Sequence, residues 1–373
     1  MRSGDDLRKP AEPIPLTVLT GFLGAGKTTL LNRLLQDEAL AGTVVIINEF
    51  GEIGLDHLLV RTIDDNIVLL QSGCLCCTLR GDLVSALEGL LRDLDNGRIS
   101  FRRVILETTG LADPAPVLQT AMAHPYLVMR FRIDGVITVV DAINGAATLD
   151  DNIESLKQVA VADRIILTKS DLADTAERRR ARDALLARLA ALNPAAPVLD
   201  AAAGEATAAR LLECGLYNPD QKIPDVKRWL AEEAYAAPAH HHHDPNRHDD
   251  RIRAFTIATD TPVSGATFEM FIDLVRSLHG PKLLRLKGIV KIAEEPDRPL
   301  VIHGVQHVMH PPVRLERWPD ADERTRIVVI TRDLAPEAVT RLFDAFLERR
   351  APDTPDRAAL FDNPLVPFGG VDR

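Results

Sequence analysis

The sequence predicts an α/β protein in two parts: a larger domain with a mostly parallel sheet, and a smaller α+β domain after it. From Leu16 to about Leu199, short apolar runs alternate with longer amphipathic ones, which is typical of repeated strand-helix units. After position 251 several strand patterns follow one another, and two helical patterns accompany them. The 373 residues are too many for one ordinary domain and suit two.

Strands of the larger domain are expected where the apolar runs lie. Several runs are apolar throughout, as strands covered by helices on both faces should be. They span 16–20, 43–48, 67–70, 103–107, 135–141, 164–168 and 197–199. Helical patterns fall between them at 27–37, 81–96, 144–158 and 175–191.

The smaller domain is predicted to hold a largely antiparallel sheet with helices on one face. Its strand patterns lie at 251–259, 282–292, 300–307, 313–317 and 326–331, and its helical patterns at 267–279 and 335–349.

These patterns divide the chain into five segments. Residues 1–14 are expected to be a disordered N-terminus, and residues 15–215 form the larger domain. Residues 216–250 are polar, contain prolines and histidines, and are predicted to be a linker. Residues 251–350 form the smaller domain, and residues 351–373 a tail.

Composition narrows the classes of partner. The chain carries 44 basic and 54 acidic residues, a net charge of −10, whereas nucleic acids and anionic membranes attract basic surfaces. We therefore expect neither among its partners, and proteins, metals or small anions instead. No apolar run approaches the roughly 20 residues of a membrane-spanning helix, and residues 1–13 show no signal-peptide core. Few, clustered cysteines favour a cytoplasmic location.

A glycine-rich turn follows the first predicted strand and opens the first helix, which is the context of a phosphate-binding loop. Its glycines allow backbone N–H groups to turn toward phosphates, and the helix N-terminus favours negative charge. We expect Lys27 to reach the β- and γ-phosphates and Thr28 to bind Mg²⁺. The larger domain is thus predicted to be a P-loop NTPase domain. The nucleotide-binding residues expected in this loop are Gly21, Gly24, Ala25, Gly26, Lys27, Thr28 and Thr29.

Two further strand ends carry acids that suit a nucleotide site. Glu107 ends the strand at 103–107, and Gly110 follows shortly after it. The carboxylate can hold the magnesium's water shell or orient the attacking water, and Gly110 lets the backbone approach the γ-phosphate. Glu49 and the residues after it form a candidate switch. Lys27, Glu107 and Glu49 are the predicted catalytic residues, although Glu107 can also be read as an ordinary strand-ending acid.

The loop after the strand at 164–168 is predicted to read the base. In the segment Thr168-Lys169-Ser170-Asp171, the Asp171 carboxylate can accept hydrogen bonds from both N1–H and the exocyclic amine of guanine, and Lys169 can lie along the base. Adenine does not offer that donor pair, so the loop favours GTP. A solvated loop is the alternative.

Three of the four cysteines lie within four residues, at Cys74, Cys76 and Cys77. Thiolates favour soft metals such as zinc, copper(I) or cobalt, or an iron-sulfur cluster. A disulfide is the poorer reading, because neighbouring Cys76 and Cys77 cannot close an unstrained bridge. A closed structural zinc site has four ligands, so a fourth position is left for water, Glu49 or a client's ligand. Cys214 is read as a small buried hydrophobe.

Histidines form two weaker groups. The first is a possible accessory metal site in the linker, or simply a solvated tract: His240, His241, His242 and His243, with His248 nearby. The second lies on or beside a predicted strand, which favours structural or surface roles over a shared ligand face: His303, His307 and His310.

Together these segments resemble the CobW-type P-loop GTPases, a family that includes cobalamin-synthesis proteins and zinc chaperones. The resemblance runs from about residue 15 to 347 and is most specific at 21–29, 48–52, 73–77 and 107–114. It implies a GTPase that uses Mg²⁺, loads zinc or a related metal such as Co²⁺ or Ni²⁺ on the cysteines, and delivers it to a client metalloprotein. The family's base-reading loop typically has asparagine where this chain has Thr168, which puts the strength of guanine preference in question.

The leading hypothesis is therefore a GTP-hydrolysing metallochaperone. The alternatives are a GTP-gated metal store or sensor, cobalt delivery for cobalamin synthesis, and a small-molecule kinase in which the cysteines would have no role. Because Cys74, Cys76 and Cys77 come between Glu49 and Glu107 in sequence, we expect the metal site to lie between these two γ-phosphate sensors.

Overall fold

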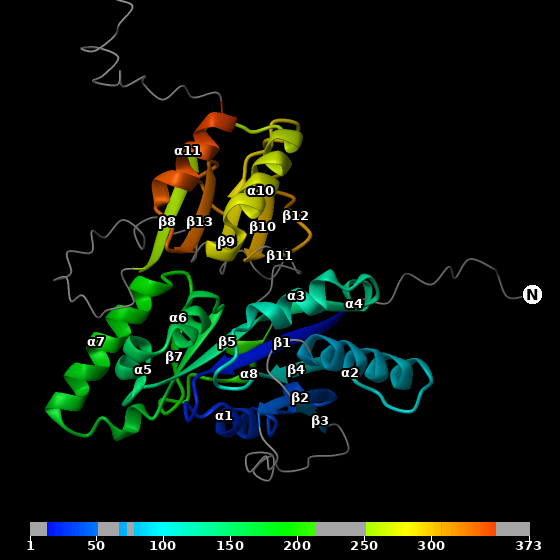
Figure 1. Cartoon of the computed structure of the whole chain (residues 1–373), viewed down its shortest axis with the longest axis vertical. Coiled ribbons are helices and arrows are strands. Elements are labelled where there is room, and N and C mark those ends of the chain that lie inside the picture. Colours follow the sequence, from blue (N-terminus) through cyan, green and yellow to red (C-terminus); the bar gives the residue numbers. More distant parts are fainter. Residues whose placement is uncertain (1–12, 51–66, 73–77, 213–250, 307, 348–373) are drawn as a thin grey trace, which may run out of the picture.

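The structure, a computed structural model, describes residues 13–50, 67–72, 78–212, 251–306 and 308–347. The described residues form two layered domains, an N-terminal domain up to residue 212 and a C-terminal domain from residue 251, which lie against each other (Figure 1). The predicted α/β fold followed by a smaller domain with an antiparallel sheet is confirmed.

A seven-stranded sheet is the centre of the N-terminal domain, and all its strand pairs are parallel. Its order is β3-β2-β4-β1-β5-β6-β7, which places β1 in the middle. The strands are β1 (Ile14–Gly21), β2 (Thr43–Phe50), β3 (Ile67–Ser72), β4 (Arg103–Glu107), β5 (Phe131–Asp141), β6 (Arg164–Thr168) and β7 (Val198–Asp200).

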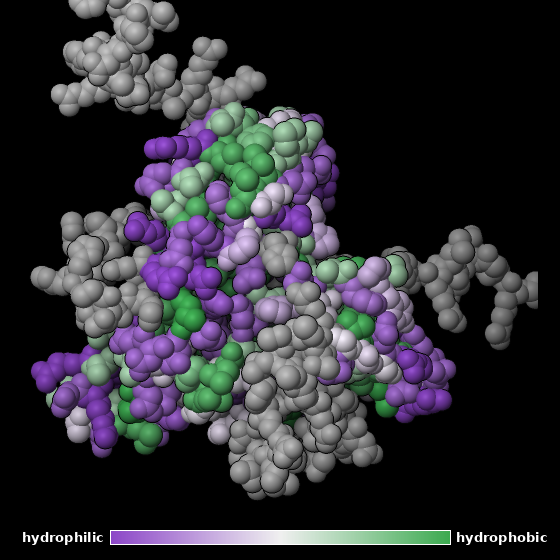
Figure 2. Space-filling model, viewed as in Figure 1, coloured by the Kyte–Doolittle hydropathy of each residue, from purple (hydrophilic) through white to green (hydrophobic). Residues whose placement is uncertain are grey.

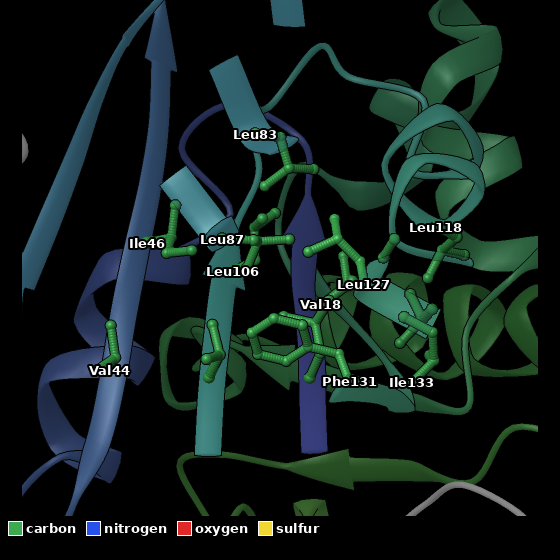
Figure 3. Close-up of a cluster of buried hydrophobic side chains, with 14 of the residues drawn as sticks. Val18, Val44, Ile46, Leu83, Leu87, Leu106, Leu118, Leu127, Phe131 and Ile133 are labelled. Atoms are coloured by element: carbon green, nitrogen blue, oxygen red, sulfur yellow. The ribbon is translucent and has the colours of Figure 1, made fainter. Parts of the chain in front are cut away.

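Helices cover both faces of this sheet. On one face α2, α3 and α4 pack on Val18 of β1 and Leu106 of β4 (Figure 3), and on the other α1 and α8 pack on Leu19 and Ile105. Neighbouring residues of one strand thus enter opposite cores, because side chains alternate across a sheet. The helices are α1 (Lys27–Leu34), α2 (Thr78–Asp95), α3 (Ala115–Ala123), α4 (Pro125–Arg130), α5 (Gly145–Asp151), α6 (Ile153–Ala160), α7 (Ala176–Leu192) and α8 (Ala208–Leu211).

The C-terminal domain holds the second sheet, whose strand pairs are antiparallel. Helices α10 and α11 cover one face of it around Phe271 and Phe343. Apolar surface remains where these helices lie side by side (Figure 2), and α10 exposes Met270 and Leu278. The elements are β8 (Ile252–Thr259), α10 (Gly265–His279), β9 (Leu283–Val290), β10 (Leu300–Val305), β11 (Val308–Met309), β12 (Val313–Arg314), β13 (Thr325–Arg332) and α11 (Pro336–Phe346).

The other face of the second sheet lies on the N-terminal domain. Leu284 of β9 and Ile330 of β13 share a core with α6 and α7, and Val305 of β10 joins the core beneath α3. Every residue of β9 is buried as a result. Without the N-terminal domain this face would expose apolar side chains to water, so the two domains stabilise each other.

Most predicted elements are present, and the differences have local causes. The helix predicted at 144–158 is two helices, because Asn152 adopts an extended conformation between α5 and α6. Helix α3 was not predicted; Pro114 and Pro116 obscure the pattern, although proline is well tolerated in the first turn of a helix. The strand predicted at 313–317 is limited to two residues.

Candidate nucleotide and metal site

The parallel strands bring their carboxyl ends, and the loops that follow them, to one edge of the first sheet. This edge is where ligands bind in open α/β sheets. The glycine-rich loop follows central β1, Glu107 ends its neighbour β4, and Asp141 ends β5 on the other side.

The order of the strands in the sheet differs from their order in the chain. Cys74 follows β3 in the chain, and β3 is the edge strand, paired only with β2 among the described strands. β2, which carries Glu49, therefore lies between β3 and the strand that ends in Glu107. The two orders differ because the connection from β3 to β4 crosses over β2.

Glycines shape the loop after β1. Gly24 and Gly26 have φ angles of 71° and 96°, in the left-handed region that favours glycine. A Cβ on Gly21 would overlap the backbone carbonyl of Val139 on β5. The loop can therefore turn tightly against the sheet and direct its backbone toward the space above α1, as phosphate binding requires.

Lys27 begins α1 and is largely buried, with 8% of its surface exposed. Its Nζ donates hydrogen bonds to the carbonyl oxygens of Gly21, at 2.9 Å, and Phe22, at 3.2 Å. These two hydrogen bonds hold the positively charged ammonium of Lys27 next to the backbone of the predicted phosphate-binding loop.

Thr28 and Glu107 come together from different elements. The Thr28 hydroxyl donates to the Glu107 Oε1 at 2.9 Å, and Glu107 is 5% exposed. A hydroxyl and a carboxylate are hard oxygen ligands of the kind Mg²⁺ prefers, directly or through its waters. The pair therefore fits a magnesium ion beside the phosphate loop, as the sequence predicted for both residues.

Asp141 is a site residue that sequence reasoning missed. Its Oδ2 accepts a hydrogen bond from Lys169 Nζ at 2.8 Å, and the same ammonium donates to the Gly24 carbonyl at 2.8 Å. Burial raises the pKa of Asp141, but hydrogen bonds from Lys169 and Asn144 outweigh it and hold that pKa below its usual value. The charged Asp141 thereby fixes Lys169 against the glycine-rich loop. It could have been found as Glu107 was, as an acid at a strand's carboxyl end.

Thr168 and Asp171, in the predicted base-reading loop, lie in different environments. The Thr168 hydroxyl donates to the Ala25 carbonyl at 2.6 Å and is buried beneath the phosphate loop. Asp171 lies in a short 3₁₀ helix and is exposed. Thr168 supports the phosphate loop, while Asp171 is accessible to a ligand.

The loop after Glu107 is held against the phosphate loop. Thr108 donates its backbone N–H to the Leu19 carbonyl and its hydroxyl to Thr20 Oγ1, at 2.9 and 2.8 Å. A Cβ on Gly110 would meet the backbone nitrogen of Leu23 at 2.5 Å. Only glycine allows the two loops to approach this closely.

The predicted zinc ligands and accessory metal ligands lie outside the described residues. This applies to Cys74, Cys76 and Cys77, and to the linker histidines His240, His241, His242 and His243; the side chain of Glu49 is likewise outside them. Within the described residues, no group of three or more His, Cys, Asp or Glu side chains could hold a metal ion.

Comparison with known proteins agrees with this geometry. Residues 15–200 match the model of the CobW/HypB/UreG nucleotide-binding domain, and residues 252–347 match that of the cobalamin synthesis protein cobW C-terminal domain. The chain belongs to the CobW family. The resemblance seen in the sequence is therefore confirmed, and the two family domains coincide with the two sheets.

Two curated relatives within the CobW family match over most of their length. The zinc chaperone YjiA of Escherichia coli is 35% identical over 332 residues, which cover 89% of this chain and 98% of the relative. The zinc chaperone CobW of a Sinorhizobium species is 32% identical, over 88% of this chain and 95% of the relative. The crystal structure of Zn(II)-bound YjiA GTPase from E. coli superimposes with a TM-score of 0.66 and 30% identity, covering 90% and 99% of the two chains.

Among its described residues, this CobW-family chain has no helix long and apolar enough to cross a membrane.

Proposed function

We propose that the protein is a GTP-hydrolysing metallochaperone, which binds zinc at Cys74, Cys76 and Cys77 and transfers it to a client metalloprotein. The observation that carries the proposal is the meeting of the phosphate loop with the Thr28–Glu107 pair at one sheet edge. Membership of the CobW family and relatives named zinc chaperones support the metal part.

Each described site residue has a role in this proposal. Lys27 and the backbone from Gly21 to Thr29 bind the phosphates, and Thr28 with Glu107 holds Mg²⁺, which neutralises charge on the β- and γ-phosphates. Gly110 brings the backbone of its loop to the γ-phosphate. Glu49, at the end of β2, acts as a further γ-phosphate sensor.

Guanine recognition rests on Asp171 and Lys169. Asp171 is exposed, so its carboxylate can accept two hydrogen bonds from guanine, while Lys169 is fixed by Asp141 beside the phosphate loop. Thr168 takes no part in base reading, because its hydroxyl supports Ala25. The absence of the family's usual asparagine therefore leaves the main guanine contact in place.

Zinc is the proposed cargo, and Co²⁺ and Ni²⁺ are the runners-up. Three neighbouring thiolates suit a soft or borderline metal, and a relative 30% identical in structure comparison is described with Zn(II) bound. Because a closed zinc site has four ligands, an open fourth position would let a client's ligand enter. The linker histidines could supply accessory binding.

The test uses the full chain loaded with one equivalent of zinc and an apo-metalloprotein from the same cell. Metal transfer should be faster with GTP than with GDP or a non-hydrolysable analogue. Lys27→Ala should abolish turnover, because it removes the phosphate-loop cation, and should leave most zinc binding intact; replacing the three cysteines by serine should do the reverse. Equal transfer with GTP and the analogue would instead support a GTP-gated store or sensor.

A further inference from the structure

We propose that Gln158 is a positioning residue for GTP hydrolysis, because its amide holds the loop that brings Gly110 to the γ-phosphate. The inference rests on the proposed hydrolysis of GTP and adds a residue on α6 that lies outside every nucleotide motif in the sequence. Gln158 is 1% exposed, and its Nε2 makes hydrogen bonds within the protein, whereas its Oε1 has no hydrogen-bond partner among the described residues.

The Gln158 side-chain amide contacts the loop after Glu107 at two backbone carbonyls. Its Nε2 donates to the carbonyl oxygen of Gly110 at 3.1 Å and to that of Ala112 at 3.0 Å. A side-chain amide has two N–H donors, and here both are used on backbone carbonyls of the same loop. Gln158 thereby fixes two peptide planes, at Gly110 itself and two residues beyond it.

Two further anchors hold this loop, one at each end. Thr108 secures the start of the loop to β1. At its end, Asp113 accepts from Lys157 Nζ at 3.0 Å and from the backbone N–H of Ala115 at 3.0 Å. Gly110 lies between these two anchors, against the backbone of Leu23. Gln158 therefore controls the part of the loop closest to the phosphate loop.

Helix α6, which carries Gln158, is held in place by a hydrogen bond to β5 and by core packing. The Gln158 backbone carbonyl accepts a hydrogen bond from the Thr138 hydroxyl of β5 at 2.7 Å, and its helix neighbours Leu156 and Val159 are in the buried core. Locking a positioning group onto packed secondary structure is what holds a catalytic arrangement within a fraction of an ångström. A displacement of a catalytic group by about 1 Å can lower the reaction rate by about a hundredfold.

The same region of the core contains a matched control residue. Asn193 is also fully buried, and its Nδ2 donates to the carbonyls of Val159, Ala160 and Ala162 at 2.8, 3.2 and 3.0 Å. It therefore stabilises backbone at the end of α6, as Gln158 stabilises the loop, but it contacts no part of the nucleotide site. Removing either amide should lower stability by a similar amount.

The experiment compares Gln158→Met with Asn193→Leu in the full chain. Methionine keeps the length and volume of glutamine without an N–H donor. We expect kcat for GTP to fall by about 10- to 100-fold in Gln158→Met, with GDP affinity within about threefold of wild type, since GDP lacks the phosphate that the loop meets. Asn193→Leu should reproduce the loss of thermal stability with kcat unchanged.

A second pair of variants keeps the test decisive if Gln158→Met does not fold. Gln158→Asn keeps the amide but is one methylene too short, so its kcat should also fall. Gln158→Glu should show a turnover that rises as pH falls, because burial raises a carboxyl pKa and only the protonated form can donate to Gly110 or Ala112. A wild-type pH profile in Gln158→Glu would overturn the positioning role.

Two further results would overturn the inference about Gln158, and one would overturn the proposed function. Wild-type kcat in Gln158→Met, or an equal loss of kcat in Asn193→Leu, would overturn the inference, the second because the effect would then come from general destabilisation. If the wild-type chain bound GTP without hydrolysing it, the proposed function itself would fail, and this is measured separately from any Gln158 variant.

Discussion

Gly110 shows how one missing Cβ can decide the shape of a site. We predict that Gly110→Ala lowers GTP turnover by about a hundredfold or more, because the new Cβ would meet the Leu23 nitrogen at 2.5 Å and must push the two loops apart. The matched control is Gly89→Ala on α2, where a Cβ meets no neighbour within 4 Å. That variant should keep full turnover and gain up to about 1 kcal/mol of stability. Single-turnover assays and thermal denaturation measure both.

Asp171 is the proposed guanine-reading residue, because its carboxylate offers two acceptor oxygens. We predict that Asp171→Asn weakens GTP binding by about tenfold or more and improves binding of xanthosine triphosphate, because an asparagine donor pairs with the 2-oxo group of xanthine. The control is Asp174→Asn, an exposed carboxylate whose partner is Arg178. Competition titration measures the nucleotide preference. An unchanged ratio of GTP to xanthosine triphosphate affinity in Asp171→Asn would assign base reading to other residues.

At the scale of elements, the two helices of the C-terminal domain begin differently. Ser264 caps α10 by accepting the Thr267 N–H at 3.1 Å, whereas Ala335 occupies the same extended position before α11 and makes no side-chain cap. We predict that Ser264→Ala costs about 1 kcal/mol of unfolding free energy and that Ala335→Ser gains up to about 1 kcal/mol. Urea denaturation measures the change in unfolding free energy of each variant, and the two changes should have opposite signs. A loss of stability in Ala335→Ser would show that packing at that position outweighs the cap.

At the scale of the whole molecule, one carboxylate joins the two domains. Asp163, which immediately precedes β6 and is 2% exposed, accepts hydrogen bonds from Arg285 at 2.5 Å and from Lys287 at 2.7 Å, both on β9, and from the Val136 N–H at 2.9 Å. Burial and the nearby Arg285 lower the pKa of Lys287 to about 8, so it is mostly charged at neutral pH.

Replacing the Asp163 carboxylate by a neutral amide would leave the buried cations Arg285 and Lys287 without this negative charge. We predict that Asp163→Asn lowers the unfolding free energy by about 3 to 5 kcal/mol, as loss of one partner of a buried ion pair does. Asp273→Asn is the control, because its pair with Arg276 on α10 is exposed and such pairs contribute at most about 1 kcal/mol. Calorimetry measures both. A change under about 1 kcal/mol in Asp163→Asn would mean that the domain contact does not depend on this network.

The same interface should respond to acid through His303 and His310. Their rings stack with centroids 4.4 Å apart, and Arg285 donates to His303 Nε2 at 2.9 Å, so that nitrogen carries no proton. Burial and then Arg285 lower the pKa of His303 well below 6.5. Burial lowers the pKa of His310 from 6.5 to about 4.

Between these values the unfolded chain binds more protons than the folded chain, so stability decreases as pH falls through 6.5 toward 4. Asp163 does not explain this window, because its pKa is held well below 3.8: burial raises it, and Arg285 and Lys287 outweigh burial. We predict that the melting temperature falls between about pH 7 and about pH 5. In His310→Phe, which keeps an aromatic ring, that fall should be smaller. An equal fall in both proteins would place the acid sensitivity elsewhere.

Local pattern in the sequence determined the fold class, most strands, the phosphate loop and the residues Lys27, Thr28 and Glu107, because periodicity and motif spacing are properties of neighbouring residues. It also indicated structural roles for the histidines, which His303 and His310 confirm; His307 lies outside the described residues. The stacking of the His303 and His310 rings was not predicted, because it depends on the hairpin of β10 and β11, which brings the two residues together.

The tertiary structure alone decided which distant residues meet. The crossover that puts β2 between β3 and β4, the hold of Asp141 on Lys169, and the reach of Gln158 to Gly110 each join segments that are well separated along the chain. The pairing of Asp163 with Arg285 spans 122 residues. Polar groups that packing buries need hydrogen-bond or charge partners. Those partners come from distant segments, so a local sequence pattern does not predict them.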